Sequence, residues 1–193
     1  MKEDQKQIQD LLDKLAAKDL HLVAQAKRVQ ALVDQLLIGF SLSKKEKKDI
    51  SIAALLHDIG NLRVSDALLY KPGRLTLEEY EEMKSHVSHS IDLVQDLSNF
   101  EQIKPLILYH HENVNGFGYP EGLEGDEIPL GARLIHVAAA FVAMTSVEGL
   151  YKKTHYTEQQ ALQELQEFSG RIYDQDIVQK MFAFYHQPEG SDL

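Results

Sequence analysis

The chain has 193 residues, which is long enough for one domain that buries about 70% of the surface of its unfolded form. Charged residues make up 26% and hydrophobic residues 44% of it, close to globular averages, which excludes a disordered chain. The net charge of −10 disfavours a nucleic acid polymer or an anionic membrane as partner, and the lack of cysteine excludes a disulfide scaffold, a thiolate metal site and a cysteine nucleophile.

Apolar spacing predicts helices along the whole chain and no convincing strand. The first helix should cover residues 3–17, with a narrow apolar stripe at Ile8, Leu11, Leu12 and Leu15. We expect residues 1–18 to pack as a helix on their own domain, or to bind a protein partner or a second copy, with 19–193 as the main domain. No signal-peptide pattern and no apolar run of about 20 residues is present, so we expect a cytoplasmic location.

The next two helices have clear starts. Asp19 is a favourable N-cap for the second, and Ser43 opens the third. The third helix is basic at first and almost entirely apolar from Ile50 to Leu56. It should therefore enter the interior just before His57 and Asp58, so that this pair lies at a buried helix end.

The second half of the chain has one long irregular stretch. Residues 113–129 are glycine-rich, and we expect them to form a functional loop over a site. Before this loop we expect a turn at Tyr70–Gly73, a helix capped at Thr76 that runs past His86 toward Leu97, and a helix near Pro105 that ends at His110 and His111. After it we expect three helices: one from Leu130 to Ser146, one capped at Thr157 that stops at Gly170, and one from about Asp174 to Tyr185.

The spacing of four histidines indicates a shared centre. Along the chain, His21, His57, His86 and His110 are separated by 36, 29 and 24 residues, each about one helix and its return. Successive helices of a bundle can therefore aim one donor each at the same point. A lone histidine is more often a packed or surface residue, and we give His155 and His186 no role.

Asp58 adds a carboxylate to this set. An aspartate after an apolar stretch is seldom buried without a partner or a metal, although it could also cap the turn at Gly60. Imidazole and carboxylate together suit iron, manganese, zinc, nickel or cobalt. Two such ions about 3.5–4 Å apart would activate water for attack on a phosphodiester.

Several motifs resemble those of the HD-GYP domain of the HD phosphohydrolase superfamily, over roughly residues 20–185. They are His21 with Arg28-Val29, Ala53–Gly60 with the His57-Asp58 pair, Lys71–Thr76, His86, His110-His111-Glu112, Gly116–Pro120 and Ile128–Arg133. The resemblance implies an all-α helical bundle with a glycine-rich loop and metal-dependent hydrolysis of cyclic di-GMP.

The resemblance also implies particular roles. The metal ligands would be His21, His57, Asp58, His86, His110 and His111, with Asp58 bridging. They would hold one or two ions, commonly iron or manganese, with zinc, nickel and cobalt as further candidates. Arg133 and Tyr119 would bind substrate.

The chain departs from the family pattern at functional positions. Asn61 stands where the family has a lysine near the reacting phosphate, and Ala139 where an aspartate completes the first metal site. Ala17 takes the place of a glutamate linked with a third ion, and residues 148–151 replace an arginine-containing phosphate motif. His136, three residues before Ala139 on the same helix face, could reach toward the first metal or fill the space.

These departures leave alternatives open. We expect a metal-binding phosphodiesterase domain of weakened activity on cyclic di-GMP, because losing one preorganised charge slows a reaction by roughly 10²–10³-fold. The alternative is an inactive module that binds a metal or a cyclic dinucleotide and acts through protein contacts. A structural domain with relic histidines is disfavoured, because unpaired buried ligands cost stability.

Overall fold

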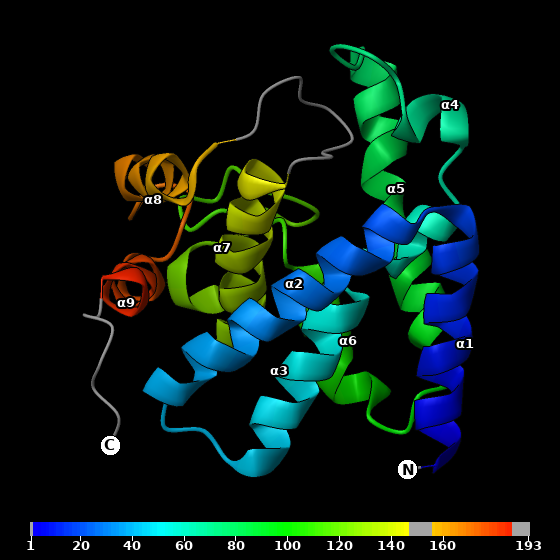
Figure 1. The fold of residues 1–193 in the computed structure, drawn as a ribbon, viewed down its shortest axis with the longest axis horizontal. Coiled ribbons are helices and arrows are strands. Elements are labelled where there is room, and N and C mark those ends of the chain that lie inside the picture. The colour runs from blue at the N-terminus through cyan, green and yellow to red at the C-terminus, as the bar shows by residue number, and fades with distance from the viewer. Residues whose placement is uncertain (1, 147–155, 187–193) are drawn as a thin grey trace.

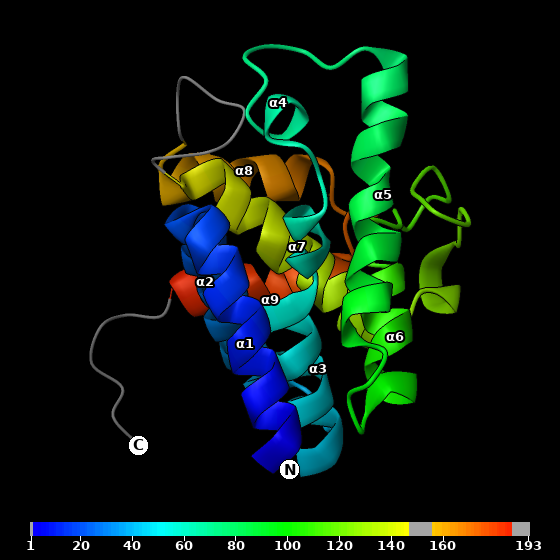
Figure 2. The ribbon, with the colours of Figure 1, turned by 90° about the vertical axis from the view of Figure 1, so that its right-hand side faces the viewer.

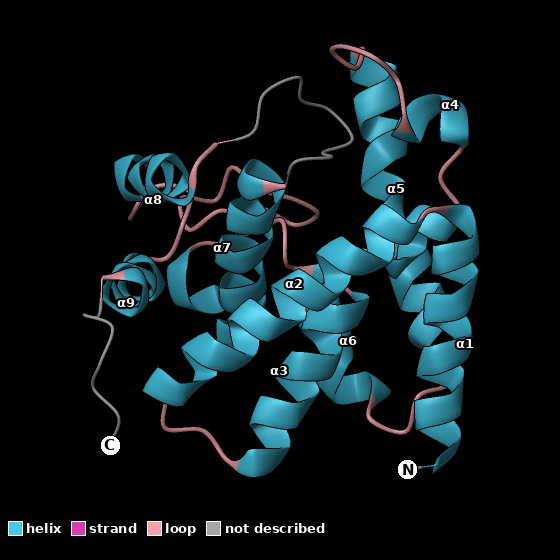
Figure 3. Cartoon of the chain, in the orientation of Figure 1, coloured by secondary structure: helices cyan, strands magenta, loops and turns pink. Residues whose placement is uncertain are grey.

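The computed structural model describes residues 2–146 and 156–186, and its regular elements are all helices. Figure 3 shows no strand in this part of the chain, and only two isolated bridges join residues there. The all-α prediction is therefore confirmed. The helices are α1 (Lys2–Lys18), α2 (Leu20–Leu36), η1 (Leu37–Gly39), α3 (Lys44–Leu56), η2 (Ile59–Leu62), α4 (Asp66–Leu69), α5 (Leu77–Val94), α6 (Phe100–Leu108), η3 (Gly125–Glu127), α7 (Leu130–Thr145), α8 (Glu158–Glu167) and α9 (Gln175–Tyr185).

Helix α2 lies at the centre of the bundle and packs against α1, α3 and α7 (Figure 1). Helices α8 and α9 cover α7, while α5 packs against η2 and α6, as Figure 2 shows from the side. Helix α4 and the first turns of α5 extend beyond the other helices at the top of Figure 1. One continuous core joins these elements, and its largest fully buried side chains include Phe141, Leu15, Leu56, Ile103, Ile107, Leu134, Ile135 and Ile177.

The predicted helix starts are confirmed by their caps. Each cap side chain accepts a hydrogen bond from a backbone N–H in the first turn, which satisfies a donor that the helix leaves without a partner. Capping boxes begin three helices, and two aspartates cap two others. The cap residues are Asp19, Ser43 with Glu46, Thr76 with Glu79, Thr157 with Gln160, and Asp174.

Helix α1 is an integral part of the domain. Its leucines at 11, 12 and 15 are buried against α2 and η2. Asp4 accepts hydrogen bonds from the backbone N–H and the hydroxyl of Ser98, and Lys18 donates to the carbonyl of Val64. The apolar stripe is thus used inside the chain, and partner binding by this helix stays a prediction. No helix in the described ranges is long and apolar enough to cross a membrane.

The turn that follows α3 is pressed directly onto α5. The backbone N–H of Gly60 donates to Ser90 Oγ at 2.8 Å, and the same hydroxyl donates to the carbonyl of His57 at 3.0 Å. A Cβ atom at position 60 would lie 1.9 Å from the carbonyl oxygen of His86. Only glycine allows this approach, which fixes the end of α3 beside the middle of α5.

Two element boundaries differ from the sequence prediction. The helix expected to run toward Leu97 ends at Val94, and the helix expected to end at His110 and His111 ends at Leu108. Pro105 lies inside α6, as the sequence allowed, where it removes one internal hydrogen bond of a helix of nine residues. The short helices η1, η2, α4 and η3 are too brief to leave a periodic apolar signal.

Candidate metal centre

Three imidazoles and one carboxylate converge in the middle of the bundle. Asp58 Oδ1 lies 3.2 Å from His86 Nε2 and 3.5 Å from His110 Nε2. His111 Nε2 lies 3.2 Å from His86 Nε2. One ligand atom from each of these four residues lies within 4.8 Å of the other three.

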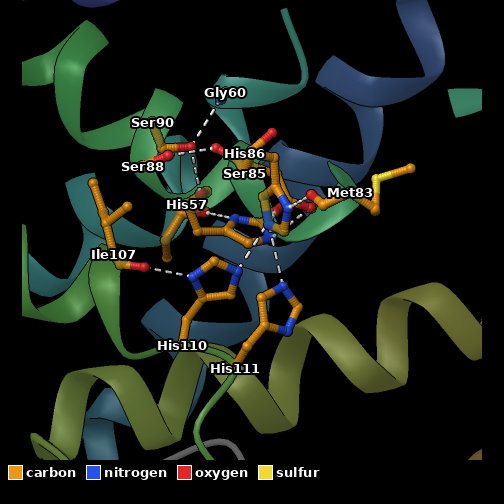
Figure 4. Close-up of polar contacts among 12 residues, drawn as sticks. His57, Gly60, Met83, Ser85, His86, Ser88, Ser90, Ile107, His110 and His111 are labelled. Carbon is orange, nitrogen blue, oxygen red and sulfur yellow. Dashed lines mark hydrogen bonds and ion pairs between the residues drawn. The ribbon is translucent and has the colours of Figure 1, made fainter. Parts of the chain in front are cut away.

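The donors come from the ends or the inner face of three helical segments, and Figure 4 shows how the histidines among them point toward one another. His57 and Asp58 follow α3, His86 lies on the buried face of α5, and His110 and His111 follow α6. Helix ends can present adjacent residues in different directions, because the backbone leaves the helical path there. This explains how neighbours such as His110 and His111 reach one centre.

Main-chain carbonyls orient three of the rings. In each case Nδ1 faces the carbonyl oxygen of the residue three positions earlier. A carbonyl oxygen only accepts, so Nδ1 carries the proton of the neutral ring and Nε2 presents a lone pair toward Asp58. The pairs are His57 with Ala54 at 2.8 Å, His86 with Met83 at 2.8 Å and His110 with Ile107 at 2.6 Å.

The lone pairs of Asp58 Oδ1 and His110 Nε2 meet without a proton donor between them. Asp58 Oδ1 and His110 Nε2 are enclosed and have no hydrogen-bond partner in the described part of the chain. Donor atoms about 2.0–2.2 Å from one transition ion are themselves about 3.0–3.5 Å apart. The separations of 3.2–3.5 Å match this spacing. These residues therefore fit a metal ion.

The electrostatics favour the ligand forms of Asp58, His110 and His111. Burial raises the pKa of Asp58, but the positive charge of His57 and the imidazoles around the carboxylate outweigh it and hold that pKa well below the usual range. Burial lowers the pKa of His110, and burial with the neighbouring charge of His110 lowers that of His111 further. Burial also lowers the pKa of His57, but the adjacent Asp58 carboxylate outweighs it, so the net shift is upward.

His57 lies on the other side of the carboxylate. Its Nε2 is 3.4 Å from Asp58 Oδ2, whereas His86 and His110 face Oδ1. His57 is not part of the group of four donors, although its ring lies edge-on to His110 at 5.1 Å. Its role as a ligand stays a proposal.

The sixth predicted ligand, His21, does not join the group. Its side chain is exposed in the first turn of α2, and its backbone N–H bonds to Asp19. Gln25, four residues later, lines both cavities beside Asp58. Positions 21 and 25 share a helix face but differ by about 6 Å along the axis. The structure therefore places Gln25, one helical turn after His21, beside Asp58, and a ligand role for His21 stays a prediction.

A cavity of about 230 Å³ separates the centre from α7. Its wall on that side consists of small residues, with Ala139 where the family pattern has a carboxylate. His136 also lines it, but its ring bonds to the backbone of Glu112 and lies 5.1 Å from the ring of Tyr173. His136 is not one of the four converging donors.

A larger cleft of about 640 Å³ adjoins this cavity at Asp58. Asn61 lines it too, and is 93% buried. Tyr119 stacks on His111, with ring centroids 4.7 Å apart and an interplanar angle of 20°. Lys84 Nζ lies 5.3 Å from the centre of the Tyr119 ring. The cleft is mainly apolar, and its remaining walls include Leu69, Arg74, Leu75, Leu77, Tyr80, Met83 and His86.

Buried Glu112 holds the glycine-rich loop in place. Its carboxylate accepts hydrogen bonds from the backbone N–H groups of Glu121, Gly122 and Leu123. The backbone of Tyr119 donates to the carbonyl of His111 at 3.2 Å, which sets the aromatic ring over the imidazole. Tyr119 therefore lines the larger cleft beside His111, and its contact with substrate stays a prediction.

Arg133 lies elsewhere, and its role in substrate binding stays a prediction. Its guanidinium is paired with Asp174 at 2.6 Å and with Asp126 at 3.0 Å, and it lines neither cavity beside Asp58. It joins the start of α7 to the start of α9 and to η3. The pairing needs partners distant in sequence, so the local motif could not reveal it.

Other residues singled out from the sequence have simpler positions. His186 belongs to no group of converging donors, and His155 and residues 148–151 lie outside the described residues. Sequence reasoning overlooked Gln25 and the role of Glu112. The signal for Glu112 was present, because a carboxylate directly before a glycine-rich loop can accept several backbone N–H groups.

Comparison with known proteins gives a consistent match. The family model described as "HD domain" matches residues 10–177. A cyclic di-GMP phosphodiesterase response regulator, RpfG, of Xanthomonas campestris is 42% identical over 139 residues, which cover 71% of this chain and 36% of that protein. A 3′3′-cGAMP-specific phosphodiesterase of Vibrio cholerae (phosphodiesterase 2) is 27% identical over 93% of this chain and 34% of its own length.

A solved structure shares the fold. Bd1817 of Bdellovibrio bacteriovorus, described as an HDG"Y"P protein, superposes with a TM-score of 0.69 at 21% identity, over 86% of this chain and 53% of its own. The chain spans about a third of the length of the two curated relatives.

Proposed function

Because the chain belongs to the HD domain family, we propose that it is an HD-GYP-type phosphodiesterase domain that hydrolyses a cyclic dinucleotide with the help of a bound transition metal. The convergence of Asp58, His86, His110 and His111 within 4.8 Å supports this proposal most directly. A set of imidazole and carboxylate donors suits iron or manganese, and we propose one of these as the metal. We also propose a cytoplasmic location, as the sequence predicts.

The metal would supply Lewis acidity and a water of lowered pKa next to the scissile phosphate. Asp58 would hold the ion through its enclosed oxygen Oδ1. The side chain as a whole is 41% exposed and lines the cleft, so the ion would lie next to a bound substrate. The imidazoles of His86, His110 and His111 would complete the protein ligands. Their orientation is set before binding by the backbone carbonyls and by the Tyr119 stack.

The cleft has room and chemistry for a nucleotide. Tyr119 and Tyr80 offer aromatic faces or edges to a base, and Arg74 is a cation on the same wall. Base stacking on an aromatic ring contributes about 1–3 kcal/mol. Because the relatives' names specify cyclic di-GMP and 3′3′-cGAMP, which share one guanine, we propose a guanine-containing cyclic dinucleotide as substrate.

We propose that turnover is slow. Asn61 places a neutral amide beside Asp58 where a lysine would add a charge, and Ala139 offers a methyl group at the wall of the smaller cavity. Removing one preorganised charge commonly costs about 10²–10³-fold in rate. The same two positions favour a second candidate, an inactive module that binds the nucleotide without cleaving it.

One experiment separates the two candidates. Protein loaded with Mn²⁺ or Fe²⁺ is incubated with cyclic di-GMP and, separately, with 3′3′-cGAMP, and the products are resolved by chromatography. Slow cleavage that disappears with a chelator and in the His110→Ala variant, but not in His186→Ala, supports the phosphodiesterase. Saturable binding with no product after prolonged incubation supports the binding module, and neither binding nor cleavage contradicts both.

A further inference from the structure

The two oxygens of Asp58 face unequal sets of donors. On the Oδ1 side, His86 Nε2 and His110 Nε2 lie at 3.2 and 3.5 Å, and His111 Nε2 is 3.2 Å from His86 Nε2. On the Oδ2 side, one imidazole, that of His57, lies at 3.4 Å. A carboxylate can bridge two metal ions only if further ligands are available for an ion on each of its two sides.

No other carboxylate or converging imidazole completes the Oδ2 side in the described ranges. Asp58 is the only carboxylate among the residues that line the two cavities beside it. The nearby polar groups Gln25 and Asn61 carry neutral amides, and Ala139 carries no donor. No second group of three or more histidines and carboxylates with converging ligand atoms occurs in the part that the structure describes.

His136 does not change this balance. It lines the smaller cavity, but its ring is committed to the backbone of Glu112 and lies against Tyr173 at 5.1 Å. Transition ions in proteins are usually held by three or four protein ligands. The Oδ1 side offers four donors, which are Oδ1 itself and the imidazoles of His86, His110 and His111. The Oδ2 side offers two, which are Oδ2 itself and the imidazole of His57.

We infer that this chain holds a single transition-metal ion, on the Oδ1 side of Asp58. The Oδ2 side stays without a metal because the cavity that His57 lines has Gln25 and Ala139 in its wall, and these supply neither a carboxylate nor an imidazole. The inference rests on the proposed function, since it concerns the same centre. It specifies the number of ions and the place of the missing ligands, which the four-donor group alone does not.

The first test counts ions in the folded chain. Metal-free protein is titrated with Mn²⁺, free Mn²⁺ is followed by electron paramagnetic resonance, and bound metal is measured by elemental analysis after dialysis. We expect one ion per chain with the spectrum of an isolated Mn²⁺. Two ions per chain with a spin-coupled spectrum would overturn the inference and leave the proposed function standing. No bound ion with Mn²⁺, and none with Fe²⁺, would overturn both.

A matched pair of variants tests which side holds the ion. His57→Asn and His86→Asn make the same change in rings that are 97% and 95% buried and bond to a carbonyl three residues earlier. Asparagine keeps an N–H donor near the position of Nδ1 and removes Nε2. We expect His57→Asn to retain one ion and His86→Asn to lose it. Loss in His57→Asn alone would contradict the assignment of sides, and circular dichroism confirms that both variants fold.

A gain of binding tests why the second side is empty. Ala139→Asp combined with Gln25→His adds a carboxylate and an imidazole at the cavity wall, and we expect the ratio to rise from one Mn²⁺ to two. Ala24→Asp combined with Gln35→His is the control, because it adds a carboxylate and an imidazole on the exposed face of α2 and no ligand at the cavity. A folded double variant that still binds one ion would contradict the stated cause.

Discussion

The ring of Tyr119 lies flat on the imidazole of His111, with centroids 4.7 Å apart. The loop residue is therefore coupled directly to a proposed metal ligand. Any base that enters the cleft beside Tyr119 lies near the metal centre, because both rings line the same 640 Å³ space. This contact links the glycine-rich loop to the chemistry of the helices.

Replacing Tyr119 should weaken nucleotide binding without removing a metal ligand. We expect Tyr119→Ala to weaken cyclic dinucleotide binding by about 5–100-fold, because an aromatic stack contributes roughly 1–3 kcal/mol. Tyr119→Phe keeps the stack and should bind nearly as well as the wild type. Calorimetric titration of the metal-loaded protein with the cyclic dinucleotide measures the affinity of both variants. Equal losses in the two variants would show that the hydroxyl, rather than the ring, makes the contact.

Glu112 should be needed for the loop and for stability. In Glu112→Gln one carboxylate oxygen is replaced by an N–H₂ group, which cannot accept from the backbone N–H groups of residues 121–123. We expect a loss of about 2–4 kcal/mol in the free energy of unfolding, measured with urea, since charged hydrogen bonds contribute about 1.5–3 kcal/mol each. The exposed Glu167→Gln is the control. A loss equal to the control would mean that the loop is held by other contacts.

Gly60 should tolerate no side chain. In Gly60→Ala the new Cβ would meet the carbonyl oxygen of His86 at 1.9 Å and the backbone nitrogen of Ser90 at 2.6 Å, and backbone atoms cannot rotate away. We expect η2 to move from α5, with a loss of about 2–4 kcal/mol in stability and weaker metal binding. Gly39→Ala, whose Cβ meets only the Lys180 side chain at 3.5 Å, should change little. Unchanged stability in Gly60→Ala would contradict this packing.

Acid should destabilise the metal-free protein in part through His136. Burial, and then the charge of His110, lower the pKa of His136 from 6.5 to about 4. The unfolded chain therefore binds a proton between these values that the folded chain does not, so stability falls as pH falls. We expect His136 to account for about 2 kcal/mol of the loss between pH 7 and pH 5.

The measurement compares two histidine variants in the presence of a chelator. Urea unfolding at pH 7 and pH 5 should show a smaller pH effect in His136→Gln than in the wild type. Exposed His186→Gln should keep the full effect. If both variants keep it, the acid sensitivity resides in other groups.

Restoring two charged groups should raise activity. We expect Ala139→Asp with Asn61→Lys to increase phosphodiesterase turnover by about 10²-fold or more, because each adds a charge beside the reacting phosphate or the metal. Ala24→Asp with Asn61→Lys controls for the added carboxylate. A double variant that binds metal but gains no rate would indicate that the cleft does not hold its substrate productively.

The sequence predicted the helices well because their signals are local. A cap such as Ser43 bonds to Glu46 three residues away, so it acts in the same way in any fold. The meeting of His57, His86 and His110 was also predictable in outline, since one donor per helix return is enough to suggest a common centre. Their distances and the carbonyl contacts required the structure.

The sequence could not show how the helices sit against one another. Gln25 lines both cavities beside Asp58, one turn of α2 after His21, and no pattern within α2 singles it out. Arg133 pairs with Asp174, which lies 41 residues away, so its own motif could not reveal this contact. Both observations depend on packing between elements rather than on the elements themselves.

The rings of His57, His86 and His110 are aimed by peptide carbonyls, and every amino acid brings such a group. Neighbouring side chains can therefore change over evolutionary time without turning these imidazoles away from their common focus. As sequences with this arrangement diverge, metal binding should therefore be lost later than catalytic activity. A protein that has shed residues needed for hydrolysis can in this way remain a receptor for metal, available for a new task.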